Sequence, residues 1–230
     1  MVKLPASGGR RHYEFSRVCR TYAGAYPVHA LVECDLAINA GEYVSVVGTS
    51  GSGKSTLLNL LGMIDAPTSG SMLVDGVDIS ELSDSARTEM RGRLIGFVFQ
   101  SFHLLRHRTA LENVSLPMIY QGVSRSERFG RSTMALERVG LGHRMSALPS
   151  TLSGGEAQRV AIARAVAGKP GILLCDEPTG NLDQGNTEQV MSLLEELNAD
   201  GLTVVVVSHD ESVARRAPRV VRVSDGVVSG

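Results

Sequence analysis

A glycine-rich segment with a lysine and several hydroxyls is the clearest chemical feature of this 230-residue chain. It reads Gly48-Thr49-Ser50-Gly51-Ser52-Gly53-Lys54-Ser55 and is followed by Thr56. Glycines let the backbone wrap closely around a polyphosphate, and the N–H groups that open a helix attract anions. We expect Lys54 to reach the β- and γ-phosphates of a nucleoside triphosphate, Ser55 to ligate Mg²⁺, and Thr56 to lie near the α-phosphate. A kinase, a GTPase or a transport ATPase could each use such a phosphate loop.

Two adjacent carboxylates, Asp176 and Glu177, follow the apolar run Ile172–Cys175. Asp176 suits the Mg²⁺ side of a triphosphate site and would act through a water molecule. Glu177 suits the general base that orients and deprotonates the attacking water. An acidic turn at the end of a buried strand is the alternative for this pair taken alone, and the phosphate loop upstream favours the catalytic interpretation.

A third segment, Leu152-Ser153-Gly154-Gly155-Glu156, lies just ahead of the apolar run that ends in the acidic pair. The Ser153 side chain can donate to a phosphate. A helix that begins at Gly154 and Gly155 presents free N–H groups and the positive end of its dipole. The alternative for Ser-Gly-Gly alone is a capped helix start, which is common in proteins.

Strands and helices alternate around these segments. Apolar runs predict strands over Tyr43–Val47, Ser71–Val74, Val77–Ile79, Ile95–Phe99, Ile172–Cys175, Thr203–Val207, Val220–Val223 and Val227–Val228, with hairpin turns at Asp75-Gly76 and Asp225-Gly226. Helical spacing predicts helices over Ser55–Met63, Leu111–Tyr120, Arg125–Val139 with Ser124 as N-cap, Gly154–Ala167 and Thr187–Leu197. This alternation predicts an α/β fold whose mostly parallel sheet is covered on both faces.

The chain reads as a single domain over residues 1–230, because no linker rich in proline, glycine or serine divides it. Residues of about 1–95 and 160–230 carry the strand signals of a nucleotide-binding core. Residues of about 100–159 change character and form a helical insertion that carries the Ser-Gly-Gly segment.

Composition excludes several classes of protein. The net charge of −1 gives no basic footprint for nucleic acid, and no apolar run is long enough to cross a bilayer. Met1–Tyr13 lacks the apolar core of a secretory signal. The cysteines, Cys19, Cys34 and Cys175, are odd in number and lack metal spacing, which indicates reduced thiols in a cytosolic protein. Attachment to a membrane must therefore come through a partner.

The order of these segments resembles that of the ABC ATPases, from about Tyr22 to Gly226. The resemblance implies an α/β fold with a P-loop NTPase core, a mostly parallel sheet, an antiparallel β subdomain and an inserted helical subdomain. It also implies binding of ATP and Mg²⁺ and hydrolysis of the ATP. Two copies of the chain would form a head-to-tail homodimer in which Ser153, Gly154 and Gly155 of one copy meet the γ-phosphate held by the other.

The resemblance assigns roles to four further residues. Gln100, after the strand Ile95–Phe99, matches a glutamine that ligates Mg²⁺ and water. His209 matches a histidine that contacts the γ-phosphate and helps to hold Glu177 and the water. Asp183 lies in Pro178-Thr179-Gly180-Asn181-Leu182-Asp183, where the family has a loop that communicates across the dimer. Tyr22 stands where the family places an aromatic ring that stacks on adenine, with Tyr26 as the competing candidate.

A narrower likeness points to the branch of lipoprotein release, macrolide export and cell division. It rests on Asn59-Leu60-Leu61-Gly62-Met63-Ile64-Asp65-Ala66-Pro67-Thr68-Ser69-Gly70, on Gly96-Phe97-Val98-Phe99-Gln100-Ser101-Phe102-His103-Leu104-Leu105, on Glu112-Asn113-Val114 and on the run Asp176–Asp183. That branch implies a membrane permease with a large extracytoplasmic domain, so the chain would be cytoplasmic and peripheral on the inner face of the cell membrane. Ser101–Arg108 and the helix Leu111–Tyr120 would form the groove that receives the permease. Cys175 and Ala157 depart from the usual pattern.

The leading hypothesis is therefore the ATPase subunit of an exporter or of a mechanotransmission complex. A second hypothesis is a cell-division regulator whose ATP-dependent dimer signals through a membrane partner to a periplasmic hydrolase. A soluble ABC ATPase of DNA repair or translation would need a long coiled-coil insertion or a second ATPase domain. A small-molecule P-loop kinase gives no role to Leu152–Glu156.

Overall fold

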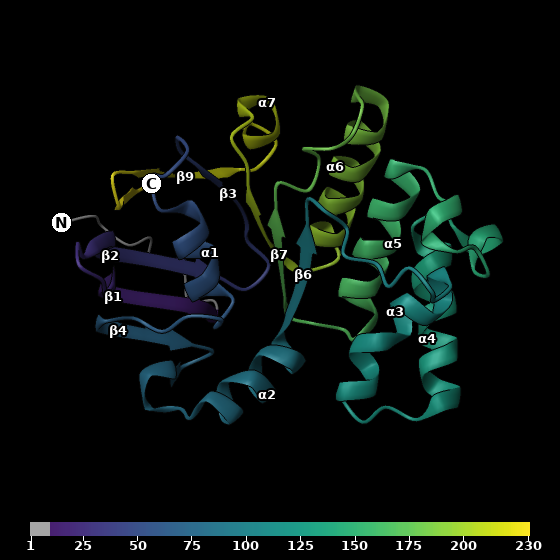
Figure 1. The fold of residues 1–230 in the computed structure, drawn as a ribbon, viewed down its shortest axis with the longest axis horizontal. Coiled ribbons are helices and arrows are strands. Elements are labelled where there is room, and N and C mark those ends of the chain that lie inside the picture. Colours follow the sequence, from purple (N-terminus) through teal and green to yellow (C-terminus); the bar gives the residue numbers. More distant parts are fainter. Residues whose placement is uncertain (1–9) are drawn as a thin grey trace. The chain divides into compact units, whose positions relative to one another are not determined.

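The computed structural model describes residues 10–230, which divide into two compact units (Figure 1). The first unit contains the chain up to Glu89 together with Val207–Gly230, and the second contains Met90–Val206. Residues 1–9, which make up most of the stretch excluded above as a secretory signal, lie outside the described residues.

An antiparallel sheet occupies much of the first unit, and Figure 1 shows its long strands side by side. In spatial order the strands are β2 (Val28–Asn39), β1 (Arg11–Tyr22), β4 (Ser69–Val74) and β5 (Val77–Asp78). The pairing of β1 with β2 shifts register between Phe15 and Arg20. Arg17 and Glu33 have positive φ there, of 48° and 44°. These bulges interrupt the regular alternation of inward and outward side chains along both strands.

The predicted turn at Asp75-Gly76 is confirmed, because both residues have positive φ and they join the antiparallel pair β4 and β5. The second strand of this hairpin is shorter than predicted. Asp78 accepts a hydrogen bond from the backbone N–H of Ser80 and so begins a 3-10 helix at Ile79 (Ile79–Glu81).

A second group of elements in the first unit carries the phosphate loop. β9 (Arg219–Ser224) pairs in parallel with β3 (Tyr43–Val47) and antiparallel with β10 (Val227–Ser229). After β3 comes the glycine-rich loop and then α1 (Lys54–Leu61). The predicted helix ran to Met63, but Met63 has a φ of 51°, a left-handed conformation that ends the helix.

The apolar side of α1 fixes this helix in the core of the first unit. Leu57, Leu60 and Leu61 have no exposed surface, and the buried hydroxyl of Tyr13 donates to the Leu61 carbonyl at 2.7 Å. Burial raises the pKa of the Tyr13 phenol well above its usual range, so the hydroxyl stays a donor. The helix that follows the phosphate loop is thus tied to strand β1.

Three strands of the second unit neighbour one another in the order β8 (Thr203–Val207), β7 (Ile172–Asp176) and β6 (Ile95–Phe99). β6 and β7 run parallel, with Phe99 opposite Asp176. Their side chains are almost wholly apolar and buried, as continuous apolar runs predict for strands covered on both faces. α2 (Asp84–Leu94), a helix that the sequence analysis did not predict, leads into β6.

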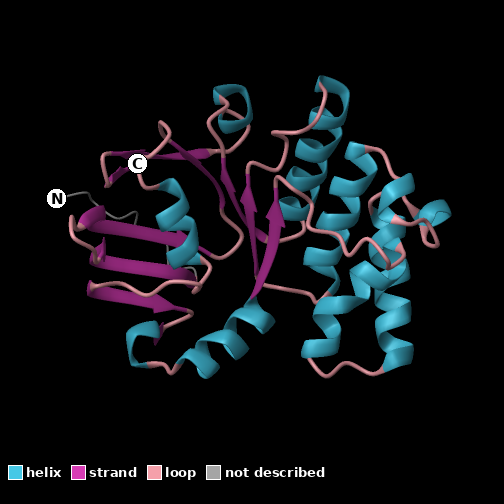
Figure 2. Ribbon diagram, viewed as in Figure 1, coloured by secondary structure: helices cyan, strands magenta, loops and turns pink. Residues whose placement is uncertain are grey.

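Four long helices complete the second unit, coloured cyan in Figure 2. They are α3 (Ala110–Tyr120), α4 (Arg125–Arg138), α5 (Gly154–Ala167) and α6 (Gln184–Ala199), and α3, α4 and α5 contact one another. The predicted bounds of α5 are confirmed, as is Ser124 as the N-cap of α4. α6 begins three residues earlier than predicted, because Asp183 caps it.

The expected combination of parallel strands, an antiparallel sheet and a helical region is therefore present. The predicted residue bounds of core and insertion stay a prediction. Among residues 10–230, no helix combines the length and the apolar character that crossing a membrane requires.

Candidate functional site

The phosphate loop lies between the end of β3 and the start of α1 in the first unit. A Cβ atom on Gly48 would lie 2.2 Å from the carbonyl oxygen of Val223, so no other residue fits there without moving β9. Gly51 and Gly53 have φ of 79° and 111°, in the left-handed region that glycine adopts freely. Glycine is therefore needed here for close packing and for backbone conformation.

The start of α1 has the properties of an anion site. Gly53 precedes the helix and provides no side-chain cap, and the first turn contains no acidic residue. Its N–H groups and helix dipole are thus left to a ligand. The Ser52 side chain is buried, and within residues 10–230 its hydroxyl has no hydrogen-bond partner. A buried polar atom without a partner fits a site that a phosphate oxygen completes.

Lys54 is held by its own loop. Its ammonium group donates to the carbonyl oxygens of Gly48 at 2.7 Å and Thr49 at 2.8 Å. These two hydrogen bonds hold the Lys54 ammonium against the backbone of the phosphate loop. Its predicted contact with the β- and γ-phosphates stays a prediction.

A cavity of about 510 Å³ adjoins the phosphate loop within the first unit. It is lined by Tyr22, Val28, His29, Ala30, Gly51, Gly53, Lys54, Ser55, Thr56, Asp225 and Gly226. An aromatic ring and the phosphate loop therefore share one cavity, which suits a ligand with a flat base and a charged tail. Tyr26, the competing aromatic residue, is 90% exposed and does not belong to this lining.

His209 also belongs to the first unit. The residue before it, Ser208, donates its backbone N–H to the carbonyl oxygen of Val46 at 3.1 Å, just ahead of the phosphate loop. The residue after it, Asp210, accepts from Ser212 and caps the short helix α7 (Glu211–Ala214). These hydrogen bonds, first those to the Ser212 hydroxyl and N–H, lower the pKa of Asp210. His209 thus stands on a connection fixed at both ends.

The acidic pair belongs to the second unit and ends β7. Asp176 is the last residue of the strand, whereas Glu177 has a φ of 45°. A left-handed backbone at a residue that is not glycine is strained and is common at active sites. The two residues therefore differ in backbone conformation, and the separate roles expected for their carboxylates stay a prediction.

Gln100 lies beside the segment that follows this pair. β6 and β7 are neighbours in register, so Gln100 follows the residue opposite Asp176. The Asn181 side chain donates to the Gln100 carbonyl at 3.0 Å, and the Gln100 side chain donates to Asn181 Oδ1 at 3.3 Å. The fold thus brings together two residues that are 81 positions apart in the sequence.

The Ser-Gly-Gly segment opens α5 with a capping box. The Ser153 hydroxyl accepts from the N–H of Glu156, and the Glu156 carboxylate accepts from the N–H of Ser153. This bond to Ser153, together with Arg144 nearby, lowers the pKa of Glu156. The capped helix start weighed above is therefore present, and the Ser153 hydroxyl still has a proton to donate.

Gly155 contacts the start of α6. A Cβ atom at Gly155 would lie 1.8 Å from Oδ1 of Asn186, whereas one at Gly154 would meet only ordinary contacts at 3.6 Å or more. Asp183 caps α6 and holds Asn186 through bonds to its N–H at 2.8 Å and its amide at 2.7 Å. The same bonds, first that from the Asn186 N–H, lower the pKa of Asp183. Asp183 therefore has a capping role, and its predicted action across a dimer stays a prediction.

Sequence reasoning missed two residues that join α5 to the site segments. Gln158 is fully buried and donates to the carbonyl oxygen of Pro178 at 2.5 Å. Arg164 donates to the carbonyl oxygens of Phe102 at 2.7 Å and His103 at 2.6 Å, and burial lowers its pKa. Phe102 and His103 both have positive φ. A polar residue on an apolar helix face was the only signal for Gln158.

A second cavity, of about 530 Å³, lies in the second unit where the sequence analysis placed a partner groove. It is lined by Leu105, Arg108, Leu111, Glu112, Ser115, Leu116, Ile119, Arg125, Arg128, Phe129 and Ser132, so it also involves α4. Leu105, Ile119 and Phe129 are exposed apolar side chains. We call this set the helical groove.

Comparisons with known proteins agree with this geometry. A family model described as ABC transporter matches residues 31–180. Uncharacterized ABC transporter ATP-binding protein YvrO of Bacillus subtilis (strain 168) is 49% identical over 203 residues, which cover 88% of this chain and 89% of that protein. Macrolide export ATP-binding/permease protein MacB of Rhodopirellula baltica is 50% identical over 209 residues, which cover 90% of this chain and 31% of that protein.

A solved structure is similar over nearly the whole chain. It is the dimeric post-hydrolysis state of the ATP-binding cassette MJ0796 bound to ADP and Pi, with 44% identity and a TM-score of 0.86. The match covers 95% of this chain and 97% of that chain.

Proposed function

Because this chain belongs to the ABC transporter family and carries its ATPase domain, we propose that it drives a membrane permease of the export or mechanotransmission type. The observation that carries this proposal is the helical groove, with exposed apolar side chains on the loop and helices where the branch likeness places the permease contact. MacB, a relative whose name combines an ATP-binding part with a permease, supports the same kind of partner. The chain would then work in the cytoplasm, on the inner face of the cell membrane.

The residues of the first unit would bind the nucleotide. ATP would place its base against Tyr22 and its phosphates in the loop Gly48–Ser55, within the cavity described above. Lys54 would turn from its backbone acceptors to the β- and γ-phosphates. Thr56 would donate near the α-phosphate, and His209 would contact the γ-phosphate.

A magnesium ion would take three oxygen donors: the Ser55 hydroxyl, the Gln100 amide oxygen and the Asp176 carboxylate, the last acting through water. Bound Mg²⁺ would neutralise charge on the β- and γ-phosphates. Glu177 would accept the proton of the attacking water and orient it towards the γ-phosphate.

Two copies would close head-to-tail on two ATP molecules. Ser153, Gly154 and Gly155 of one copy would face the γ-phosphate held by the other, and Asp183 would act near the same interface. A symmetric interface of this kind presents the same surface twice. Loss of the γ-phosphate removes the bridge, so hydrolysis would release the copies and return the permease to its resting state.

The helical groove provides the test of the partner. Phe129 on α4 lines the groove, and Met134 on the same helix lies outside its lining, yet both are 60% exposed. We expect Phe129→Asp to abolish co-purification with the permease and its stimulation of ATP hydrolysis, with the basal rate unchanged. Met134→Asp is the matched control and should keep both. Equal binding of the permease by the two variants would contradict the assignment.

Identification of the permease separates the two forms of this function. Cross-linking of the chain in its native membranes, followed by mass spectrometry, would identify what it binds through the groove. A permease that exports small molecules or lipoproteins supports the transport form. A partner that recruits a periplasmic hydrolase supports the regulatory form of the cell-division kind.

A further inference from the structure

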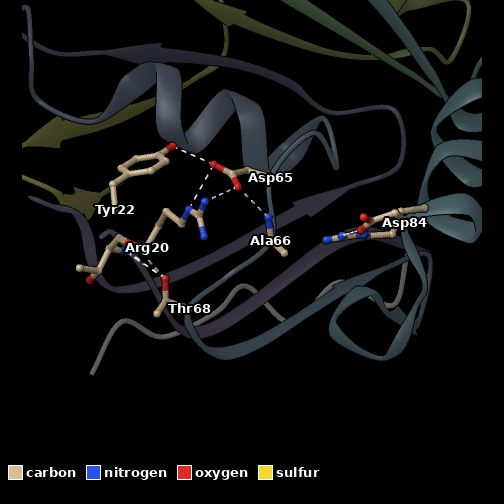
Figure 3. Close-up of polar contacts among 8 residues, drawn as sticks. Arg20, Tyr22, Asp65, Ala66, Thr68 and Asp84 are labelled. Carbon is tan, nitrogen blue, oxygen red and sulfur yellow. Dashed lines mark hydrogen bonds and ion pairs between the residues drawn. The ribbon is translucent and has the colours of Figure 1, made fainter. Parts of the chain in front are cut away.

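Tyr22, which lines the cavity beside the phosphate loop, forms a cluster with Arg20 and Asp65 (Figure 3), and of these three residues the proposed function uses only Tyr22. We call this cavity the nucleotide cavity. Asp65 accepts a hydrogen bond from the Tyr22 hydroxyl at 2.8 Å. It also forms an ion pair with Arg20, with 2.5 Å between the closest nitrogen and oxygen. The guanidinium carbon of Arg20 lies 4.6 Å from the centroid of the Tyr22 ring. We call Arg20, Tyr22 and Asp65 the tyrosine clamp.

The clamp restricts the Tyr22 ring in two ways. The hydrogen bond to Asp65 fixes the hydroxyl end, and the Arg20 guanidinium covers one ring face in a cation–π contact. Tyr22 lines the nucleotide cavity, whereas Arg20 and Asp65 do not. The two charged residues would therefore influence a ligand through Tyr22.

Helix α1 connects the phosphate loop to the segment that carries Asp65. α1 begins in the phosphate loop, and just past its end the N–H groups of Ile64 and Asp65 donate to the Asn59 carbonyl at 2.9 and 3.2 Å. Asp65 then holds Tyr22. These contacts hold the Tyr22 ring at a fixed distance from the phosphate loop.

The end of β1 that carries Tyr22 is anchored as well. The N–H of Thr21 donates to the Thr68 hydroxyl at 3.0 Å, and the N–H of Thr68 donates to the carbonyl oxygen of Cys19 at 2.8 Å. Both contacts join β1 to the segment that follows α1 and Asp65. The ring is thus fixed through its backbone and through its hydroxyl.

Shielding from water strengthens the clamp. The Arg20 and Asp65 side chains are only 23% and 20% exposed, whereas exposed ion pairs contribute little because water and salt screen them. A ring that is already held in its binding orientation loses less conformational entropy when a base stacks on it. The ring face opposite Arg20 is then the one on which a base would stack.

We propose that Arg20 and Asp65 are positioning residues that hold Tyr22 as a one-sided platform for the nucleotide base. They set how much the base adds to the affinity that the phosphate loop provides. This inference rests on the proposed stacking of the base on Tyr22. Arg20 and Asp65 themselves contact neither the base nor the phosphates.

Affinities for ADP and for inorganic pyrophosphate, measured by calorimetry on the full chain, test the role. The ATPase reaction consumes neither ligand. Pyrophosphate has no base, so it should bind to the phosphate loop without contacting Tyr22. We expect Arg20→Met and Asp65→Ala to weaken ADP binding roughly 2- to 10-fold and to leave pyrophosphate binding unchanged.

Tyr22→Phe, which keeps the ion pair and removes only the hydroxyl tether, should also weaken ADP binding selectively. Arg17→Met, which removes an exposed arginine of the same strand, is the control and should change neither affinity.

The Tyr22→Ala background separates the possible results. If Arg20→Met and Asp65→Ala act through Tyr22, they add no further loss of ADP affinity in that background. A loss that persists there, an equal loss for both ligands, or no loss in the single variants would overturn the positioning role. Unchanged ADP affinity in Tyr22→Ala alone would remove the stacking role of Tyr22 and the clamp with it.

Discussion

The backbone of Glu177 is strained, at the residue whose carboxylate is proposed to orient the attacking water. Its left-handed backbone follows a buried, regular strand, so the chain turns sharply at the residue that would act as base. Such a conformation costs on the order of 1–3 kcal/mol and persists only where the surrounding structure holds it. Asp176, by contrast, is the last residue of the regular strand, so the two neighbouring residues differ in backbone conformation.

Replacement of Glu177 by glutamine tests its role as base. The amide has nearly the same shape but cannot accept the proton, so we expect hydrolysis to fall at least about 100-fold while ATP binding is kept. Dimers with bound ATP should then accumulate. Phosphate release and size-exclusion chromatography in ATP measure the two effects, and a variant that hydrolyses ATP at the parental rate would contradict the assignment.

Lys54→Ala tests the phosphate loop at the residue scale. The substitution removes the ammonium that would pair with the β- and γ-phosphates, so calorimetry should show no measurable ATP binding. Lys169→Asn is a suitable control, because Lys169 has a φ of 57°, which asparagine also adopts readily. An affinity unchanged by Lys54→Ala would exclude Lys54 from the site.

At the scale of elements, the sequence predicts the bounds of strands and helices best where their side chains are buried in a regular pattern. The strand Thr203–Val207 and the helix Gly154–Ala167 have the predicted bounds, because long apolar runs and a cap mark them. The sequence analysis missed α2 because none of its residues is buried, so it has no apolar periodicity. It predicted no strand at β1 or β2, because the bulges at Arg17 and Glu33 break the alternation of inward and outward side chains.

The contact between α5 and α6 gives a prediction at this scale. In Gly155→Ala the new methyl group would collide with Asn186, which Asp183 holds by two hydrogen bonds. We expect unfolding in urea to show a loss of about 1–3 kcal/mol, the usual cost of overpacking. Gly154→Ala should unfold near the parental midpoint, since its methyl group meets only ordinary contacts. Equal stability of the two variants would show that Asn186 moves aside freely.

At the scale of the whole molecule, the proposed head-to-tail dimer predicts complementation between two defective chains. Both carry Glu177→Gln. One also carries Lys54→Ala and lacks a working phosphate loop, and the other carries Ser153→Arg and lacks a working helix start. Each chain alone should remain monomeric in ATP. Their mixture should form dimers, more weakly than the Glu177→Gln parent, because one complete ATP site remains.

Analytical ultracentrifugation of the two chains and of their mixture measures this effect. ADP in place of ATP is the control and should leave every sample monomeric. A mixture that stays monomeric in ATP, or a Ser153→Arg chain that dimerises by itself, would contradict a site shared between copies.

Residue types and spacing alone could predict the candidate site only where its residues are close in the sequence, whereas Tyr22 was assigned from the family resemblance. Gly48–Ser55 is one contiguous loop, so its spacing alone indicated phosphate binding. The cavity wall is different, because Ala30 and Gly226 meet through the pairing of distant segments, with the N–H of Val32 donating to the Gly226 carbonyl at 2.9 Å. Loops and strands so far apart in one sequence carry no local signal of their contact.

The thiols described by this structure have a practical consequence for spectroscopy. Cys175 is fully buried and its pKa is raised by that burial, and burial also raises the pKa of Cys34 to about 12. Near neutral pH neither forms the thiolate that reacts with maleimide dyes. Cys19 alone is partly accessible among the three, so its replacement would leave a background on which fluorophores could be attached at chosen engineered positions.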